Sequence, residues 1–223
     1  MLKRYFIILI LAVSTLLSLY EFYKRGVAHL YYSNSNKAYK LTVNEREGDL
    51  ILLKKAEENI IKAINLIPKD PHYLHLKANI LNSIDFKNSN LHEVKSLLQQ
   101  SVKLRSSWWG TWIDLAYVNI QIEGFSPESK FYLNKAQQLG GLQIGFVNSY
   151  LMILIENWNN LDSKDTYNFY SYLKIASRNN ATFSNIMKYA YSKDKHELIC
   201  IQIRYDSNYK TFKDSSLYSN YCN

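Results

Sequence analysis

The stretch INLIPKDPHYLHLKANI, residues 64–80, indicates how the chain folds, because one helix ends and another begins inside it. Apolar residues from position 50 to 67 recur with the i, i+3, i+4 spacing of a helix that buries one face. Pro68 lacks an amide N–H and ends this helix. Asp70 suits the N-cap of the next helix and Pro71 its first position. The stretch therefore predicts two helices joined by a tight turn.

Two later stretches repeat this boundary, VKLRSSWWGTWIDLAYV at 102–118 and QQLGGLQIGFVNSYLMI at 137–153. The equivalent positions, at offsets of 38 and 35 residues, are Leu66, Leu104 and Leu139 in the first helix and Ala78, Ala116 and Leu151 in the second. A period near 34 residues is typical of tetratricopeptide repeats, whose hairpins stack to bury a continuous core. We predict an all-α protein with an N-terminal transmembrane helix followed by a tetratricopeptide-like α-α hairpin solenoid. The alternative is an irregular α bundle.

The composition of the 223 residues agrees with a helical protein. Only 7 Gly and 3 Pro are present, which disfavours turn-rich β folds and glycine-rich phosphate loops. The chain is 47% hydrophobic and 14% aromatic, enough to build a folded core. Its net charge of +8 is spread over scattered lysines, so no nucleic-acid partner is expected.

The N-terminus carries an uncharged run, YFIILILAVSTLLSLY at residues 5–20, flanked by Lys3-Arg4 and Lys24-Arg25. A cleaved signal peptide and an uncleaved anchor both fit this pattern, and we favour the anchor because no good cleavage site follows. A count of the positive charges on either side of the run favours a cytoplasmic location for the main domain. Short N-terminal tails usually stay inside, however, so we expect an inner-membrane anchor with a periplasmic domain. The predicted division is an anchor at 1–25, a repeat domain at 26–205 and a partly ordered tail at 206–223.

The segment LRSSWWGTWIDLA, residues 104–116, is the most specific stretch of the sequence. It resembles the R-P-x-W-P-x-x-W-x-x-L-A signature of VpsP-type polysaccharide biosynthesis proteins, which are membrane-anchored helical-repeat proteins. The matching residues are Arg105, Trp108, Trp112, Leu115 and Ala116. Ser106 and Trp109 stand where the family usually has proline. The resemblance implies a role in making or exporting an extracellular or capsular polysaccharide, and it implies no catalytic residue.

The two cysteines, Cys200 and Cys222, belong to no metal-binding motif. From these residues alone, two free thiols and one disulfide are equally plausible interpretations. The disulfide requires an oxidising compartment. Their contexts, Leu198-Ile-Cys200 and Tyr221-Cys222, resemble a terminal L-L-C … Y-C pair of the VpsP-type family. This resemblance, together with an exported domain, favours the disulfide.

We expect no catalytic residue, cofactor or metal site. His72 and His75 are spaced i, i+3, but no third ligand follows at a suitable distance. The candidate partner or glycan surface consists of aromatic residues, Trp108, Trp109, Trp112, Tyr167 and Tyr170. For the tryptophans, packing between helices is the more ordinary interpretation, and stacking on sugar rings or on a partner is the alternative. The aromatic run at 167–172 covers more than one helix face, so some of its rings should be exposed.

The function predicted from these observations is that of a scaffold or regulator, not an enzyme, in exopolysaccharide or capsule biosynthesis and export. Its partners would be a glycosyltransferase, a polymerase or an exporter. One alternative is an adaptor of another envelope assembly, such as a secretion system or a pilus. A further alternative is a subunit of a glycan-modifying enzyme.

Overall fold

The structure is a computed structural model that describes residues 2–44, 50–84 and 90–222. The described residues form helices joined by turns, with no strand among them, so the predicted all-α class is confirmed. The chain divides into two compact units, residues 1–106 and residues 107–223. Each unit is described separately below.

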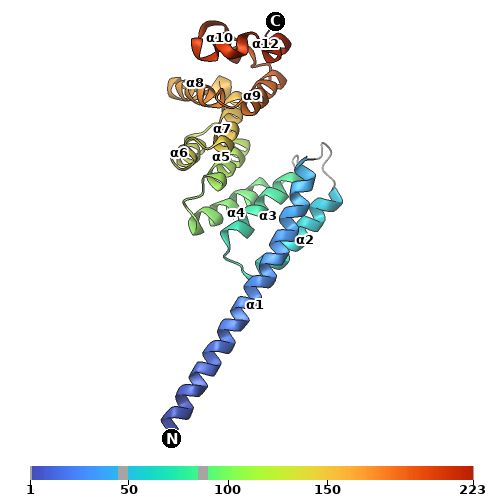
Figure 1. The fold of residues 1–223 in the computed structure, drawn as a ribbon, viewed down its shortest axis with the longest axis vertical. Coiled ribbons are helices and arrows are strands. Elements are labelled where there is room, and N and C mark those ends of the chain that lie inside the picture. The colour runs from blue at the N-terminus through green and yellow to red at the C-terminus, as the bar shows by residue number, and fades with distance from the viewer. Residues whose placement is uncertain (1, 45–49, 85–89, 223) are drawn as a thin grey trace. The chain divides into compact units, whose positions relative to one another are not determined.

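Within its described residues, the first unit contains the helices α1 (Leu2–Asn44), α2 (Leu50–Leu66), α3 (Pro71–Ile84) and α4 (Leu91–Leu104) (Figure 1). Each helix packs against the next, and α1 also contacts α3. Small side chains allow α1 and α2 to approach closely. Ala28 and Ala56 are fully buried, and the Ser35 hydroxyl donates a hydrogen bond to the Ala56 carbonyl at 2.7 Å.

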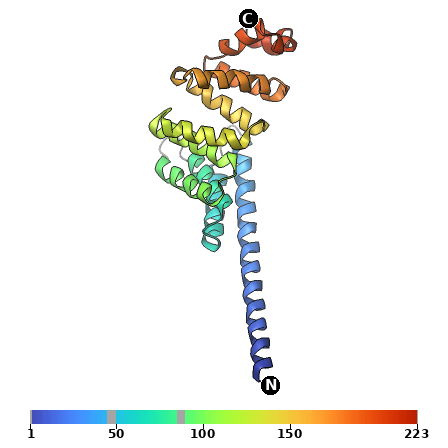
Figure 2. The same ribbon diagram turned by 90° about the vertical axis from the view of Figure 1, so that its left-hand side faces the viewer.

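The N-terminal half of α1 extends beyond the other helices of its unit in both views (Figures 1 and 2). Its apolar side chains are solvent-exposed, including Tyr5, Leu9 and Leu16. Within the described residues, this helix is long and apolar enough to cross a membrane. The expected boundary at residue 25 falls inside α1, which continues without a break into the folded part of the unit.

The second unit contains α5 (Trp109–Glu123), α6 (Pro127–Gly140), α7 (Ile144–Glu156), a 3-10 turn η1 (Trp158–Asn160), α8 (Ser163–Ala176) and α9 (Asn180–Ser192). Helices α5 and α6 pack together as one hairpin, and α7 and α8 as another. The first helices of these hairpins also contact each other, α5 against α7, and α7 in turn contacts α9. Phe146, Leu151, Leu154 and Phe183 are fully buried in this core.

Side-chain caps and a glycine fix several helix ends, including the start of α3 at Asp70-Pro71 that the sequence predicts. Asp70 Oδ1 accepts a hydrogen bond from the amide of His72 at 2.8 Å. Ser126 caps α6 with Pro127 in its first turn, and Asp162 caps α8 in a capping box with Asp165. Gly141 ends α6 with a positive φ of 45°, a conformation that glycine adopts without strain. A cap accepts hydrogen bonds from backbone amides within its own turn of helix. Such helix boundaries can therefore be predicted from short segments of sequence.

The residues aligned as equivalent in the sequence occupy equivalent places in the helices. Leu66 and Leu104 are the last residues of α2 and α4, and Leu139 lies one residue before the end of α6. Their counterparts in the following helices, Ala78, Ala116 and Leu151, are all fully buried.

The C-terminal part is helical over most of its described residues. Residues 206–223 were expected to form a partly ordered tail. They contain a 3-10 turn η2 (Ser207–Tyr209) and two short helices, α11 (Lys210–Lys213) and α12 (Ser216–Tyr221), which follow α10 (Glu197–Tyr205). Helix α12 packs against both α9 and α10. Tyr209 and Phe212 are buried against Phe183 of α9, with Phe183–Phe212 ring centroids 4.3 Å apart. These apolar contacts account for the order.

Candidate functional site

Trp108 and Trp109 begin α5 and stack on each other, with ring centroids 6.2 Å apart. The Trp109 indole Nε1 donates a hydrogen bond to Oε1 of Gln143 at 2.7 Å, and its ring meets Phe146 of α7 edge-on at 5.9 Å. Trp109 therefore joins the first hairpin of this unit to the second. Trp108 is the N-cap residue and is 39% exposed.

Trp112 lies one turn further along α5 and contacts a different helix. Its ring meets Phe131 of α6 edge-on at 6.3 Å and lies 6.0 Å from the ring of Tyr132. Trp109 and Trp112 are three residues apart, a spacing that places both on one side of a helix. They lie on neighbouring parts of α5, but one packs towards α7 and the other towards α6. The three tryptophans thus do not form one flat platform, and Trp108 is the outermost of them.

Tyr167 and Tyr170 of α8 have different surroundings. Tyr167 is 73% exposed. Tyr170 is half-buried and meets Trp158 and Phe169 edge-on at centroid distances of 6.2 and 5.2 Å. Burial raises the pKa of the Tyr170 phenol. Only Tyr167 of this pair offers its ring freely to a ligand or partner.

A cavity of about 230 Å³ opens on the side of the second unit formed by α5, α7 and α9. Its apolar wall includes Ile113, Met152 and Ile153, and its polar groups are those of Asp114, Tyr117, Ser149, Glu156 and Tyr189. Sequence analysis did not find this site. Asp114 and Tyr117 are spaced i, i+3, as are Ile153 and Glu156, but such pairs are common on amphipathic helices, and only the fold brings three helices together.

An ion pair lies beside this cavity and affects the tyrosines that line it. Lys193 Nζ forms an ion pair with Glu156 Oε1 at 2.8 Å and lies 5.5 Å from the ring centroid of Tyr189. Burial raises the pKa of the Tyr189 phenol, and the neighbouring Glu156 carboxylate raises it further. The pKa of Tyr117 is raised by burial and by Glu156 as well. The Tyr189 phenol is hydrogen-bonded to Glu156, and the Tyr117 phenol to Gln121, so both hydroxyls are held by neighbouring side chains beside the cavity.

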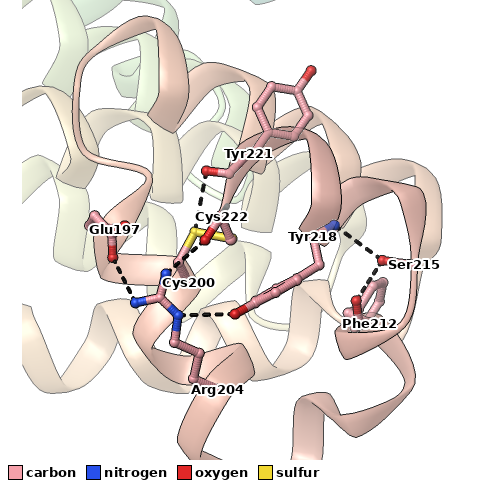
Figure 3. The surroundings of a disulfide bond; sticks show 8 residues. All are labelled: Glu197, Cys200, Arg204, Phe212, Ser215, Tyr218, Tyr221 and Cys222. Carbon is pink, nitrogen blue, oxygen red and sulfur yellow. Dashed lines mark hydrogen bonds and ion pairs between the residues drawn. A yellow bond between two sulfur atoms is a disulfide. The ribbon is translucent and has the colours of Figure 1, made fainter.

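Cys200 of α10 and Cys222, just after α12, are joined by a disulfide, with their Cα atoms 5.5 Å apart (Figure 3). Arg204 reinforces the same connection. Its Nη2 donates to the Cys222 carbonyl at 2.7 Å and its Nε donates to the Tyr218 hydroxyl at 3.0 Å. Figure 3 shows the guanidinium between these groups and Glu197, the carboxylate of which lies 3.4 Å from Nη1. The C-terminus is thus attached to α10 by one covalent bond and several polar contacts.

Arg105, from the 104–116 segment, contacts His72 of the histidine pair in the first unit. Arg105 Nη1 donates to Nε2 of His72 at 2.7 Å, and burial followed by the Arg105 charge lowers the pKa of His72. His75 Nε2 lies 3.3 Å from Nδ2 of Asn79. Among residues 2–44, 50–84 and 90–222, no three His, Cys, Asp or Glu side chains are placed to hold a metal ion together.

Comparison with known proteins gives no assignment, since no family model matches the chain and no curated protein matches it.

Proposed function

We propose that this protein is a non-enzymatic, membrane-anchored scaffold of stacked helical hairpins that assembles or regulates a bacterial machine for polysaccharide synthesis and export. Helix α1 would anchor it in the inner membrane, and residues beyond the anchor would lie in the periplasm. Its partners would be a glycosyltransferase, a polymerase or an exporter.

The observation that carries this proposal is the cavity shared by α5, α7 and α9. Helices α5 and α7 are the first helices of successive hairpins, and α9 follows in the same order. In solenoid repeats, the equivalent helices of successive hairpins line one continuous face, which is the usual place for partner segments to bind. A cavity with apolar walls and protonated phenols suits a protein segment that supplies both apolar and hydrogen-bonding groups.

The polysaccharide context rests on the resemblance of residues 104–116 to VpsP-type proteins. The exposed apolar half of α1 and the disulfide support the membrane and periplasmic parts of the proposal, because stable disulfides form in oxidising compartments.

Crosslinking of the full chain in intact membranes, followed by identification of the captured proteins, tests the scaffold role. We expect a glycosyltransferase, polymerase or exporter of a polysaccharide pathway to be captured. Tyr117→Ala, which opens the cavity, should reduce capture several-fold. Tyr205→Ala removes the same ring at a position that is 84% exposed and outside the cavity, and should leave capture unchanged.

Two results would contradict the proposal. Capture of secretion or pilus-assembly proteins alone would favour an adaptor of another envelope machine. Turnover of an oligosaccharide by the purified chain, lost in Glu156→Gln or Asp114→Asn, would show that the cavity is an enzyme active site.

A further inference from the structure

A second cavity, of about 390 Å³, lies in the first unit between α1 and the last turns of α2. Three tyrosines and a lysine of α1 line it, together with a lysine of α2: Tyr20, Tyr23, Tyr31, Lys24 and Lys62. Both helices belong to one unit and pack closely along their length, so the cavity is a property of the hairpin itself.

This cavity lies where the exposed apolar part of α1 meets the folded unit. The uncharged run ends at Tyr20, and the first fully buried residue of α1 is Ala28. Helix α2 returns alongside α1 and brings its C-terminal end, with Lys62 and Leu66, to this level (Figure 1). If α1 crosses a membrane with residues 5–20 in the hydrocarbon, the cavity therefore lies at the membrane–water interface.

The groups in and near the cavity carry excess positive charge. Lys24 Nζ lies 3.9 Å from Glu21 Oε1, a long ion pair that contributes little free energy and that a phosphate could replace. Lys62 Nζ lies 5.7 Å from the ring centroid of Tyr31, which holds the ammonium at the cavity wall. Arg25 follows Lys24 directly in α1, and the Lys69 charge just after α2 is offset in sequence by Asp70.

The tyrosines that line this cavity are also suited to contact a lipid headgroup. Tyr20 and Tyr23 are largely exposed, and tyrosine is enriched at the level of lipid headgroups because its ring is apolar and its hydroxyl is polar. Lysine ammonium groups and phenol hydroxyls both donate hydrogen bonds to phosphate oxygens. The apolar wall formed by Leu66 lies on the membrane side of Lys62 and would contact the lipid's glycerol and upper acyl carbons, which a free phosphate ion lacks.

We propose that this cavity binds the phosphate-bearing headgroup of an anionic membrane lipid, with Lys24 and Lys62 pairing with the phosphate and Tyr20 and Tyr23 contacting the lipid below it. This inference rests on the membrane insertion of α1 that the proposed function requires. It adds a site on the first unit that is separate from the cavity of α5, α7 and α9.

The test uses the full chain in detergent, titrated with phosphatidylglycerol or phosphatidylcholine bearing a fluorescent acyl chain, with anisotropy as the readout. We expect preference for phosphatidylglycerol, and a loss of about tenfold in this preference in Lys24→Gln/Lys62→Gln, as basic residues near a membrane attract anionic lipid. The matched control is Lys40→Gln/Lys54→Gln. It removes the same charge from exposed positions on the same two helices, outside the cavity, and should retain the preference.

Three results would overturn the lipid site: equal weakening in both double variants, no weakening in either, or displacement of the lipid by inorganic phosphate at the same concentration as by unlabelled phosphatidylglycerol. Flotation with phosphatidylcholine vesicles distinguishes failure of the lipid site from failure of the membrane anchor. A chain that does not float contradicts the anchor of the proposed function and with it the lipid site. A chain that floats without preferring phosphatidylglycerol contradicts the lipid site alone.

Discussion

Trp109 of α5 donates a hydrogen bond from its indole Nε1 to Oε1 of Gln143, 2.7 Å away and 34 residues later in the chain. Gln143 is the N-cap residue of α7, so the bond connects the start of one hairpin to the start of the next. The same ring lies against Phe146, and an added Cβ on Gly145 would be 3.2 Å from it. Trp109 thus makes the contact between the two hairpins.

Replacing Trp109 should therefore destabilise the second unit more than replacing its neighbour. Trp109→Ala removes a half-buried ring and leaves the Gln143 amide without this donor, at a cost of about 2–3 kcal/mol in unfolding free energy. Trp108→Ala removes a more exposed ring and should cost about 1 kcal/mol or less. Urea unfolding of the full chain in detergent, followed by circular dichroism, measures both. Equal losses would contradict the packing role of Trp109.

The helix boundaries were predictable because they depend on local chemistry. Pro68 follows the end of α2 and Asp70 caps α3, both as predicted, and Ser126 and Asp162 cap α6 and α8 in the same local way. The periodic apolar stripe likewise identified residues that are buried, such as Ile60 and Ala63. Properties of a single helix end or helix face are therefore contained in short segments of sequence.

The site residues were harder to predict because they depend on which helices meet. A spacing of three residues places Trp109 and Trp112 on one side of α5, but that side borders α6 and α7 together, so the rings diverge. The cavity near Tyr117 needs α9, which lies more than 60 residues later in the chain. The packing of α12 against α9 joins segments whose sequences share no repeat pattern.

Gly140 should tolerate no larger side chain. An added Cβ would lie 2.6 Å from Cγ of Phe146, which is fully buried and has no room to move aside. We expect Gly140→Ala to lower the unfolding free energy by about 1–3 kcal/mol, the usual cost of overpacking a core.

Gly26→Ala is the control for this substitution. Gly26 lies within α1, and an added Cβ there meets nothing within 4 Å. Alanine is the better helix former, so this variant should be unchanged or more stable by up to about 1 kcal/mol. Thermal unfolding of the two variants beside the parent chain measures the difference. A Gly140→Ala variant as stable as the parent would show that α6 and α7 do not pack as closely as described.

The disulfide should hold the C-terminal helices in place. It closes a loop with a sequence separation of 22 residues. Because the bond restricts the unfolded chain, a loop of this length stabilises the folded state by about 3 kcal/mol. In Cys200→Ser/Cys222→Ser, we expect trypsin to cleave at Lys210 and Lys213 faster than in the parent chain. Cleavage elsewhere in the second unit should change less, since Trp109 and Phe146 hold the earlier hairpins.

The same cysteines report on which side of the membrane the domain lies. When cells are denatured without reductant and then treated with a maleimide reagent, a chain whose domain was periplasmic should stay unlabelled, because both thiols are bonded. Labelling should appear after reduction. Full labelling without reductant would place the domain in a reducing compartment and contradict both the export of the domain and the disulfide.

Lys130 of α6 should make the second unit sensitive to acid. Its Nζ lies 2.6 Å from Asp162 Oδ2 and 2.7 Å from Asp165 Oδ2, at the start of α8. The hydrogen bond from Lys130, followed by that from the Asp165 amide, lowers the pKa of Asp162 from 3.8 to about 2. A carboxyl group with a lowered pKa in the folded state stabilises the fold above its unfolded pKa, and this contribution is lost as the pH falls towards the folded pKa.

We therefore expect the unfolding free energy of the parent chain to fall between pH 3.8 and pH 2 more steeply than that of Lys130→Gln. Removing the ammonium lets the Asp162 pKa return towards its ordinary value, so less stability remains to be lost in this range. Lys135→Gln is the matched control, since Lys135 lies on the same helix with its Nζ 5.8 Å from the ring centroid of Phe131, and its acid profile should follow that of the parent. Urea unfolding at a series of pH values measures all three chains. A Lys130→Gln profile as steep as the parent's would show that Lys130 does not set the Asp162 pKa and that the contact between α6 and α8 is not electrostatic.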